Sequence, residues 1–138
     1  MIERILLPTD GSAFSERAAD YAIGMADKFK STVVAVHVVE MSAPKQLDIA
    51  SLDREAARRA ETCFKSIREK AEDGDTEVET KVLISRSIGE AILEELEEGN
   101  YDLVVMGTHG LSGVKKLLLG SVSEAVVHHT TKPVLLIK

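Results

Sequence analysis

Cysteine and aromatic residues are scarce in this chain of 138 residues, and tryptophan is absent. The single cysteine, Cys63, excludes a disulfide within the chain and any metal site built from several thiolates. Because Cys63 falls in a helical pattern of apolar residues, we interpret it as a small buried hydrophobic side chain and not as a reactive thiol. Aromatic residues make up 4% of the chain, which leaves few side chains that could stack on nucleic acid bases.

Positive charge is also in short supply. The chain has 17 lysines and arginines against 23 acidic residues, for a net charge of −6, and the two signs are interleaved. This pattern predicts that nucleic acid is not a partner. No apolar run approaches the roughly 20 residues of a transmembrane helix, and the opening Met1–Leu7 is too short for a signal-peptide core. We therefore expect no membrane association and a cytoplasmic location.

The sequence does contain a regular alternation of short apolar runs with helical patterns. Its length fits a single domain over residues 1–138. Runs rich in valine, isoleucine and leucine predict five strands, at 2–7, 32–39, 77–84, 102–107 and 133–137. Helical spacing predicts four helices between them, from Phe14 to Phe29, from Leu52 to Ala71, from Ile88 to Leu96 and around Val122–Val126. The alternation favours an α/β fold with a parallel sheet covered by helices on both faces.

Two segments outside the helices have their own implications. The stretch Met41–Ala50 fits neither periodicity, and we expect it to be a loop that could cover a ligand. The last predicted strand is an unbroken apolar run, and as an edge strand it would expose unpaired hydrogen-bonding groups. Pairing of residues 133–138 with a second copy of the chain would cover that edge, so we expect a homodimer.

The loops after the first and fourth predicted strands carry the candidate site. Pro8, Thr9 and Asp10 follow the first strand, and a glycine-rich loop starting at Gly107 follows the fourth. In a sheet of order 3-2-1-4-5 these loops are neighbours at the point where the strand order reverses, which is where ligands bind in such sheets. Asp10 would accept hydrogen bonds from a base or ribose, and the glycine loop would hold phosphates. The pair predicts a nucleoside phosphate site.

The glycine loop reads as an anion cradle that leads into a helix. Gly107, Gly110 and Gly120 would let backbone N–H groups approach a phosphate closely. The spacing of these glycines matches neither the Walker loop nor the Gly-x-Gly-x-x-Gly dinucleotide loop. A purely structural interpretation, in which the glycines only turn the chain, stays open at this point.

The helix that follows the glycine loop begins with a capping-box pattern. Ser121 stands three residues before Glu124, so we expect the Ser121 side chain to cap the helix. The hydroxyl groups of Ser121 and Ser123 and the first-turn N–H groups of Val122 and Ser123 would then face an anion. Capping alone is the competing explanation for these residues.

The histidines do not point to catalysis. His109 has no second ligand at metal-binding spacing, so we expect it to bind a phosphate or form a hydrogen bond within its loop. His37 interrupts an apolar strand, which is typical of a hydrogen-bonded core imidazole. We assemble no Ser-His-Asp or paired-carboxylate arrangement, and we predict neither catalytic residues nor a metal site in the protein itself.

The spacing Gly107-x2-Gly110-x9-Gly120-Ser121 resembles the loop of the ATP-binding universal stress protein family, and the resemblance extends along the whole chain. Its other landmarks are the segments Ile5–Ser12, Val36–Val39, Tyr101–Gly107 and Lys132–Leu136. The resemblance implies a Rossmann-like fold of the adenine nucleotide alpha hydrolase type. It further implies five parallel strands in the order 3-2-1-4-5, a dimer paired through the last strand, and ATP bound with magnesium or manganese.

The resemblance also assigns contacts to individual residues. The positions implied around adenosine, ribose and phosphates are Pro8, Thr9, Asp10, Val38, Met106, Gly107, His109, Gly110, Gly120, Ser121, Val122 and Ser123. The protein would be a nucleotide-dependent regulatory dimer of the stress response. A slow ATPase or nucleotidyl-transfer enzyme is one alternative, and a dimeric interaction module that binds no nucleotide is another.

The sequence departs from the family pattern in two places. Leu111 stands where many relatives carry a basic residue, which leaves Lys115 and Lys116 as the nearest cations in the chain. Arg86-Ser87-Ile88 replaces the Gly-x-Pro that many relatives have before the third helix, and we expect only a local change of that loop.

Overall fold

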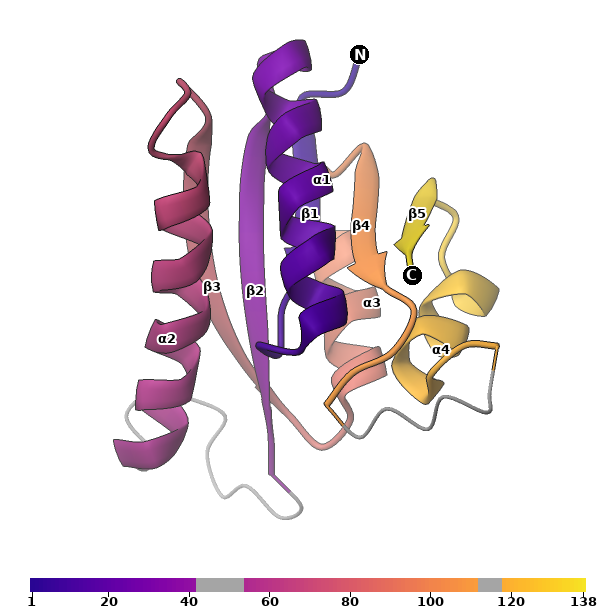
Figure 1. The fold of residues 1–138 in the computed structure, drawn as a ribbon. Helices are drawn as coiled ribbons and strands as arrows, with labels where there is room; N and C mark the ends of the chain where they lie inside the picture. Colours follow the sequence, from indigo (N-terminus) through magenta and orange to yellow (C-terminus); the bar gives the residue numbers. More distant parts are fainter. Residues whose placement is uncertain (42–53, 112–117) are drawn as a thin grey trace.

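Strands and helices alternate from one end of the chain to the other (Figure 1). The structure is a computed structural model, and it describes residues 1–41, 54–111 and 118–138. Its elements are β1 Arg4–Pro8, α1 Ala13–Phe29, β2 Thr32–Glu40, α2 Arg54–Ala71, β3 Glu77–Ser85, α3 Ile88–Glu98, β4 Leu103–Gly107, α4 Ser121–His129 and β5 Val134–Ile137. The predicted loop at Met41–Ala50, apart from Met41, and both Lys115 and Lys116 lie outside the described residues.

The five strands form one parallel sheet in the order β3-β2-β1-β4-β5, which confirms the predicted topology. The central strand β1 pairs with β2 on one side and β4 on the other, and Leu6 is in register with both Val34 and Val104. The chain order of the strands therefore reverses between β1 and β4. The loops that leave these two strands meet at the same edge of the sheet.

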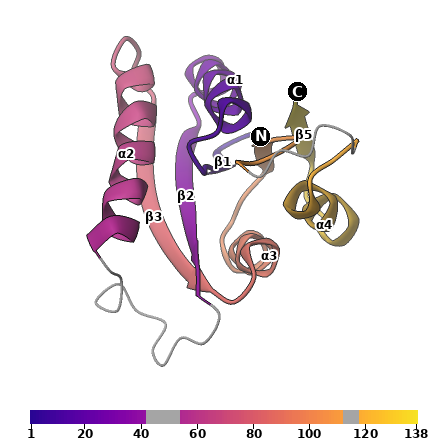
Figure 2. The same ribbon diagram turned by 60° about the horizontal axis from the view of Figure 1, so that its bottom comes forward.

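Helices cover both faces of the sheet (Figure 2). One hydrophobic cluster joins α1 and α2 to the face that carries Ile5, Leu7 and Val33. A second cluster joins α3 and α4 to the opposite face, which carries Leu6 and Val34. Alternate residues of β1 and β2 thus point into different clusters, and this is why the runs Ile5–Leu7 and Val33–Val36 are apolar without a break.

The first half of β3 departs from the prediction that helices cover both faces of every strand. Glu77, Glu79 and Lys81 are exposed. The reason is that β3 is an edge strand of the sheet, where charged side chains hinder pairing with another chain. The predicted bounds of the other strands agree with the structure to within two residues.

Serine side chains begin two of the helices. Ser12 accepts a hydrogen bond from the N–H of Ser15 at 3.2 Å at the start of α1, and Ser87 caps α3 in the same way. The predicted serine cap of α4 is wrong, because the capping position is occupied by Gly120 and Ser121 is already helical. Since glycine has no side chain, α4 starts without a side-chain cap. Among the described residues, no helix is long and apolar enough to span a membrane.

Candidate ligand pocket

A cavity of about 530 Å³ opens at the carboxyl ends of the strands. The structure brings all the residues that the sequence singled out to this one cavity: Pro8, Thr9, Asp10, Val38, Met106, Gly107, His109, Gly110, Gly120, Ser121, Val122 and Ser123. They come from the loop after β1, the end of β2, the end of β4 and the start of α4. The volume falls in the range of pockets that enclose small organic ligands.

Asp10 fastens the two loops of the pocket to each other. One carboxylate oxygen accepts a hydrogen bond from the N–H of Ser12 at 2.9 Å, and the other accepts one from the N–H of Leu111 at 3.0 Å. Asp10 therefore connects two loops of the protein, a structural role that the sequence did not predict for it. Each carboxylate oxygen has a second lone pair, so the side chain can still accept a hydrogen bond from a bound molecule.

Two of the loop glycines are required by neighbouring protein atoms. A Cβ atom at Gly107 would lie 2.7 Å from the Cβ of Phe14, and one at Gly110 would lie 2.6 Å from a carboxylate oxygen of Asp10. Both distances are shorter than real contacts allow. The structural interpretation that the sequence left open thus has support at these two positions: glycine lets β4 pack on α1 and lets Asp10 reach the opposite loop.

Two other groups expected to face an anion are already used by the protein. The N–H of Gly120 donates a hydrogen bond to the carbonyl of Thr108 at 2.7 Å, which brings the two ends of the glycine loop together. The buried hydroxyl of Ser123 donates to the carbonyl of Gly107 at 2.8 Å. These two groups are therefore not free for an anion, and among the described residues the first turn of α4 remains as the part of the predicted cradle that could bind one.

The start of α4 retains the properties of an anion site. The first hydrogen bond at this end runs from the N–H of Glu124 to the carbonyl of Gly120, so the N–H groups of Ser121, Val122 and Ser123 have no acceptor within the helix. Ser121 is exposed and lines the cavity. Unpaired N–H groups and the helix dipole together favour negative charge at this end of the pocket.

Another part of the cavity wall is apolar. It is formed by Val36, Val38, Ile88, Ile92 and Met106. These side chains belong to the cluster that α3 and α4 build on their face of the sheet. Sequence reasoning found Val38 and Met106 but missed the other three, because a helix or strand pattern marks a residue as apolar without showing that it borders a cavity.

His37 forms the pocket wall on the opposite face of the sheet. Its Nδ1 lies 2.9 Å from the carbonyl oxygen of Thr9, and this confirms the expected hydrogen-bonded imidazole. The Sγ of Cys63 lies 3.9 Å from the same nitrogen. Burial raises the pKa of the Cys63 thiol, which favours the neutral form and agrees with the interpretation of Cys63 as a structural residue.

His109 is held within its loop. Its Nδ1 lies 3.0 Å from the hydroxyl of Thr108, and its ring lies 5.1 Å from the ring of Phe14, between centroids. The expected loop hydrogen bond is therefore present. Because Phe14 stands at the start of α1, this contact connects the pocket to that helix.

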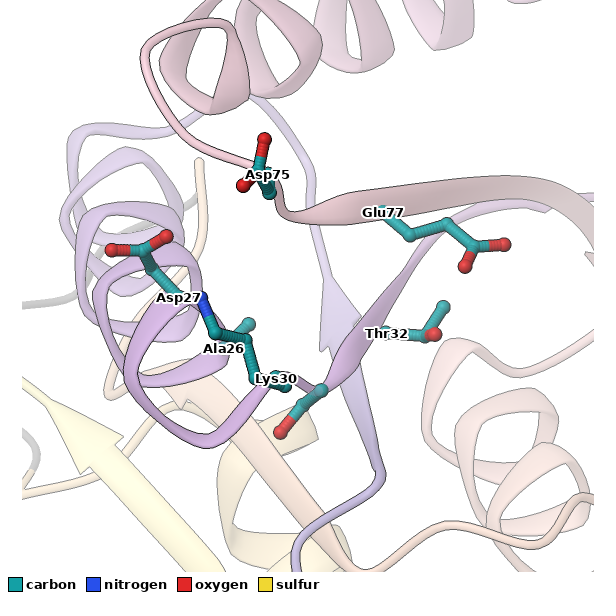
Figure 3. A pocket seen from close by; sticks show the side chains of 7 residues that line it. Ala26, Asp27, Lys30, Thr32, Asp75 and Glu77 are labelled. Carbon is teal, nitrogen blue, oxygen red and sulfur yellow. The ribbon is translucent and has the colours of Figure 1, made fainter.

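A second, smaller hollow lies at the opposite end of the sheet and is shown in Figure 3. It has a volume of about 110 Å³ and three carboxylates at its wall, those of Asp27, Asp75 and Glu77. This volume is below the range of small-molecule pockets. Among the residues with described positions, no group of three or more histidine, cysteine, aspartate or glutamate side chains could hold a metal ion.

The fold and the site define a parallel α/β protein with a ligand pocket at the reversal point of its sheet. The sequence profile of the universal stress protein family matches residues 1–138. The chain belongs to the universal stress protein family.

Curated relatives match over the full length of the chain. Universal stress protein MJ0531 of Methanocaldococcus jannaschii is 33% identical, and the match covers 100% of this chain and 83% of the relative. A universal stress protein of Thermus aquaticus is 35% identical, with 100% of both chains covered.

Solved structures have the same fold. The hypothetical protein MJ0577 superimposes with a TM-score of 0.82 at 28% identity, covering 100% of this chain and 96% of that one. A universal stress protein in complex with cAMP gives 0.79 at 22% identity, with 99% and 97% covered. The Archaeoglobus fulgidus universal stress protein in complex with dAMP gives 0.75 at 21% identity, with full coverage of both chains.

Proposed function

We propose that this protein binds an adenine nucleotide, with ATP as the ligand, and acts as a regulatory protein of the stress response. The observation that carries the proposal is the cavity of about 530 Å³ with the unpaired first-turn N–H groups of α4 on its wall. The complexes of two structural neighbours with cAMP and dAMP support the adenine part of the ligand. Family membership supports the role in stress and, with it, a cytoplasmic location.

The chemistry of the pocket wall suggests an orientation for the nucleotide. The base would occupy the apolar part between Val38, Ile92 and Met106, since a flat, weakly polar ring gains most from burial there. The phosphates would then lie at the first turn of α4, where the hydroxyl of Ser121 adds a donor. Asp10, between the two parts, would accept a hydrogen bond from a ribose hydroxyl.

A magnesium or manganese ion would enter the pocket together with the phosphates. The described residues offer no cluster of metal-binding side chains, so the protein would hold the ion through the nucleotide and through the hydroxyl of Ser121. The ion would neutralise part of the phosphate charge. This neutralisation matters here because Leu111 carries no charge next to Gly110.

We propose further that two copies of the chain pair through β5. Its run of valine, leucine and isoleucine stands at an edge of the sheet, whereas the opposite edge strand, β3, carries exposed Glu77, Glu79 and Lys81. An apolar edge favours pairing and a charged edge opposes it. Nucleotide binding could influence the pairing of this edge, because the pocket loop is bonded to β5: the N–H of Thr108 donates a hydrogen bond to the carbonyl of Ile137 at 2.9 Å.

Isothermal titration calorimetry with ATP and magnesium tests the proposal. We expect saturable binding in the wild-type protein and its loss in Gly120→Trp, which puts a large side chain at a position on the pocket wall. Gly24→Ala, on the far part of α1 with open space around it, is the control and keeps the wild-type affinity. Absence of saturation at millimolar nucleotide, with folded protein, would refute the proposal. Sustained phosphate release over many turnovers would instead favour an enzyme.

A further inference from the structure

The pocket has walls from helices on both faces of the sheet. Its wall includes Ile88 and Ile92 of α3 and also Ala56 and Arg59 of α2. Because α2 and α3 pack on opposite faces of the sheet, the cavity crosses the carboxyl edge of the strands and continues on the α2 side. We call this continuation, lined by His37, Ala56 and Arg59, the α2 lobe.

The position of the α2 lobe follows from contacts of Cys63. The Sγ of Cys63 in α2 lies 3.9 Å from Nδ1 of His37, which fixes where α2 meets the end of β2. Arg59 precedes Cys63 by four residues, so the two lie on the same side of the helix, one turn apart. Arg59 therefore stands one turn closer to the start of α2, and its exposed side chain lines the same cavity as His37.

Arg59 carries a positive charge that has no acidic partner among the residues with described positions. Among the pocket residues that the structure describes, it is the only lysine or arginine. None of the ion pairs between described residues includes Arg59. By contrast, Lys70 near the end of α2 and Lys81 on β3 are each paired with carboxylates.

His37 lines the same lobe with an imidazole ring that the protein holds in place. Since Nδ1 lies 2.9 Å from the carbonyl of Thr9, which only accepts hydrogen bonds, Nδ1 must carry a hydrogen atom. The bond to Thr9 fixes the orientation of the imidazole at the wall of the lobe, and Arg59 supplies the positive charge of the lobe.

We infer that the α2 lobe is a second anion subsite, formed by Arg59 and His37, that takes a phosphate or carboxylate group. Asp10 and Glu40 also line the cavity and oppose an anion. Both oxygens of Asp10 already accept hydrogen bonds from N–H groups, however, and Glu40 is exposed at the end of β2. The planar guanidinium of Arg59 suits phosphate and carboxylate because it can donate two hydrogen bonds at once.

The anion could be a group of the bound nucleotide or a separate molecule. Only the first version rests on the proposed function, because it requires that a nucleotide binds in the pocket. One set of titrations compares AMP with adenosine 2′,5′-bisphosphate and adenosine 3′,5′-bisphosphate by calorimetry. Another adds inorganic phosphate or acetate, with and without AMP, and follows the imidazole NMR signals of His37. Both sets are repeated with Arg59→Met, Arg59→Lys and Arg58→Met.

Arg58→Met is the matched control, because Arg58 is an exposed arginine of α2 like Arg59 but does not line the cavity. We expect one bisphosphate to bind about tenfold more tightly than AMP, or inorganic phosphate to shift the His37 signals. Arg59→Met should abolish that response, Arg59→Lys should retain part of it, and Arg58→Met should leave it unchanged. A gain with a bisphosphate assigns the anion to the nucleotide, and a response to phosphate or acetate assigns it to a separate molecule.

The inference is overturned if no anion produces a response, or if Arg58→Met reduces the response as much as Arg59→Met. Failure of the proposed function looks different. In that case AMP does not bind, while phosphate still shifts the His37 signals in a manner that depends on Arg59. Thermal unfolding of each variant establishes that it is folded before these comparisons are made.

Discussion

The carboxylate of Asp10 accepts a hydrogen bond from the backbone N–H of Leu111 at 3.0 Å, across 101 positions of sequence. This bond joins the loop after β1 to the loop after β4 at the mouth of the pocket. The second oxygen of Asp10 accepts a hydrogen bond from the N–H of Ser12, so both carboxylate oxygens are held by the protein. The pocket walls are thereby held in place before any ligand arrives, which lowers the entropy cost of binding.

Gly110→Ala should break this connection. The added Cβ would lie 2.6 Å from the Asp10 oxygen, so the carboxylate or the loop must shift away from its present position. We expect the free energy of unfolding to fall by about 1–3 kcal/mol, measured by urea denaturation. Nucleotide affinity should fall as well. A variant with wild-type stability and affinity would show that the loops do not need this contact.

Gly24→Ala should have the opposite effect on stability. Gly24 is an exposed residue within α1, and a Cβ there meets no atom within 4 Å. Alanine loses less backbone entropy than glycine on entering a helix, so we expect a gain of about 0.5–1 kcal/mol. The same denaturation measurement checks the prediction. Loss of stability would mean that the exposed face of α1 is covered in solution.

Substitution of the two serines at the start of α4 should have different effects, one on the stability of the protein and the other on nucleotide affinity. Ser123→Ala removes a buried hydroxyl and leaves the carbonyl of Gly107 without its partner, which should cost about 1–3 kcal/mol of stability. Ser121→Ala removes an exposed hydroxyl, and stability should change by less than about 0.5 kcal/mol. If the phosphates lie where we propose, only Ser121→Ala weakens nucleotide binding with stability intact. Calorimetry alongside denaturation distinguishes the two patterns.

Tyr101 should make the protein sensitive to alkaline pH. Burial and the 2.7 Å hydrogen bond to Glu95 raise the pKa of the Tyr101 phenol above its ordinary value of 10.0. Below pH 10 the folded and unfolded chains both keep the proton, so the contribution of this group is fully present. As pH rises above 10, the unfolded chain releases its proton first, and the free energy of unfolding decreases.

Tyr101→Phe should remove this part of the pH dependence. In the wild type the decrease from this group approaches about 1.4 kcal/mol for each pH unit above 10. Tyr21→Phe is the control, because Tyr21 is 56% exposed. Urea denaturation at about pH 9, 10 and 11 gives the slope of the free energy of unfolding against pH for each protein. Equal slopes in all three proteins would contradict the assignment to Tyr101.

Leu136→Pro should dissociate the proposed dimer. The carbonyls of Pro133 and Ile137 face β4, so by alternation the N–H of Leu136 points away from the sheet, and proline removes it. Analytical ultracentrifugation should give twice the chain mass of 15.0 kDa for the wild type and the mass of one chain for the variant. Leu136→Val keeps the N–H and should stay dimeric. A monomeric wild type would refute pairing through β5.

Local patterns in the sequence determined the order of the elements, the parallel sheet and the two loops of the pocket. Unbroken apolar runs such as Ile5–Leu7 identify strands with both faces buried, and this information lies within a few neighbouring residues. The strand order 3-2-1-4-5 came from the family resemblance. Family motifs likewise supplied the residues on the pocket wall, including Val38, which no local pattern distinguishes from other core valines.

Only the tertiary structure decided what the pocket residues contact. Nothing near Asp10 in the sequence indicates Leu111 as its partner, and nothing near Gly107 indicates that Phe14 packs against it. Arg59 and His37 likewise line one cavity only because α2 packs beside the end of β2. Periodicity reports whether a side chain is buried, whereas the identity of its neighbour depends on how distant segments pack together.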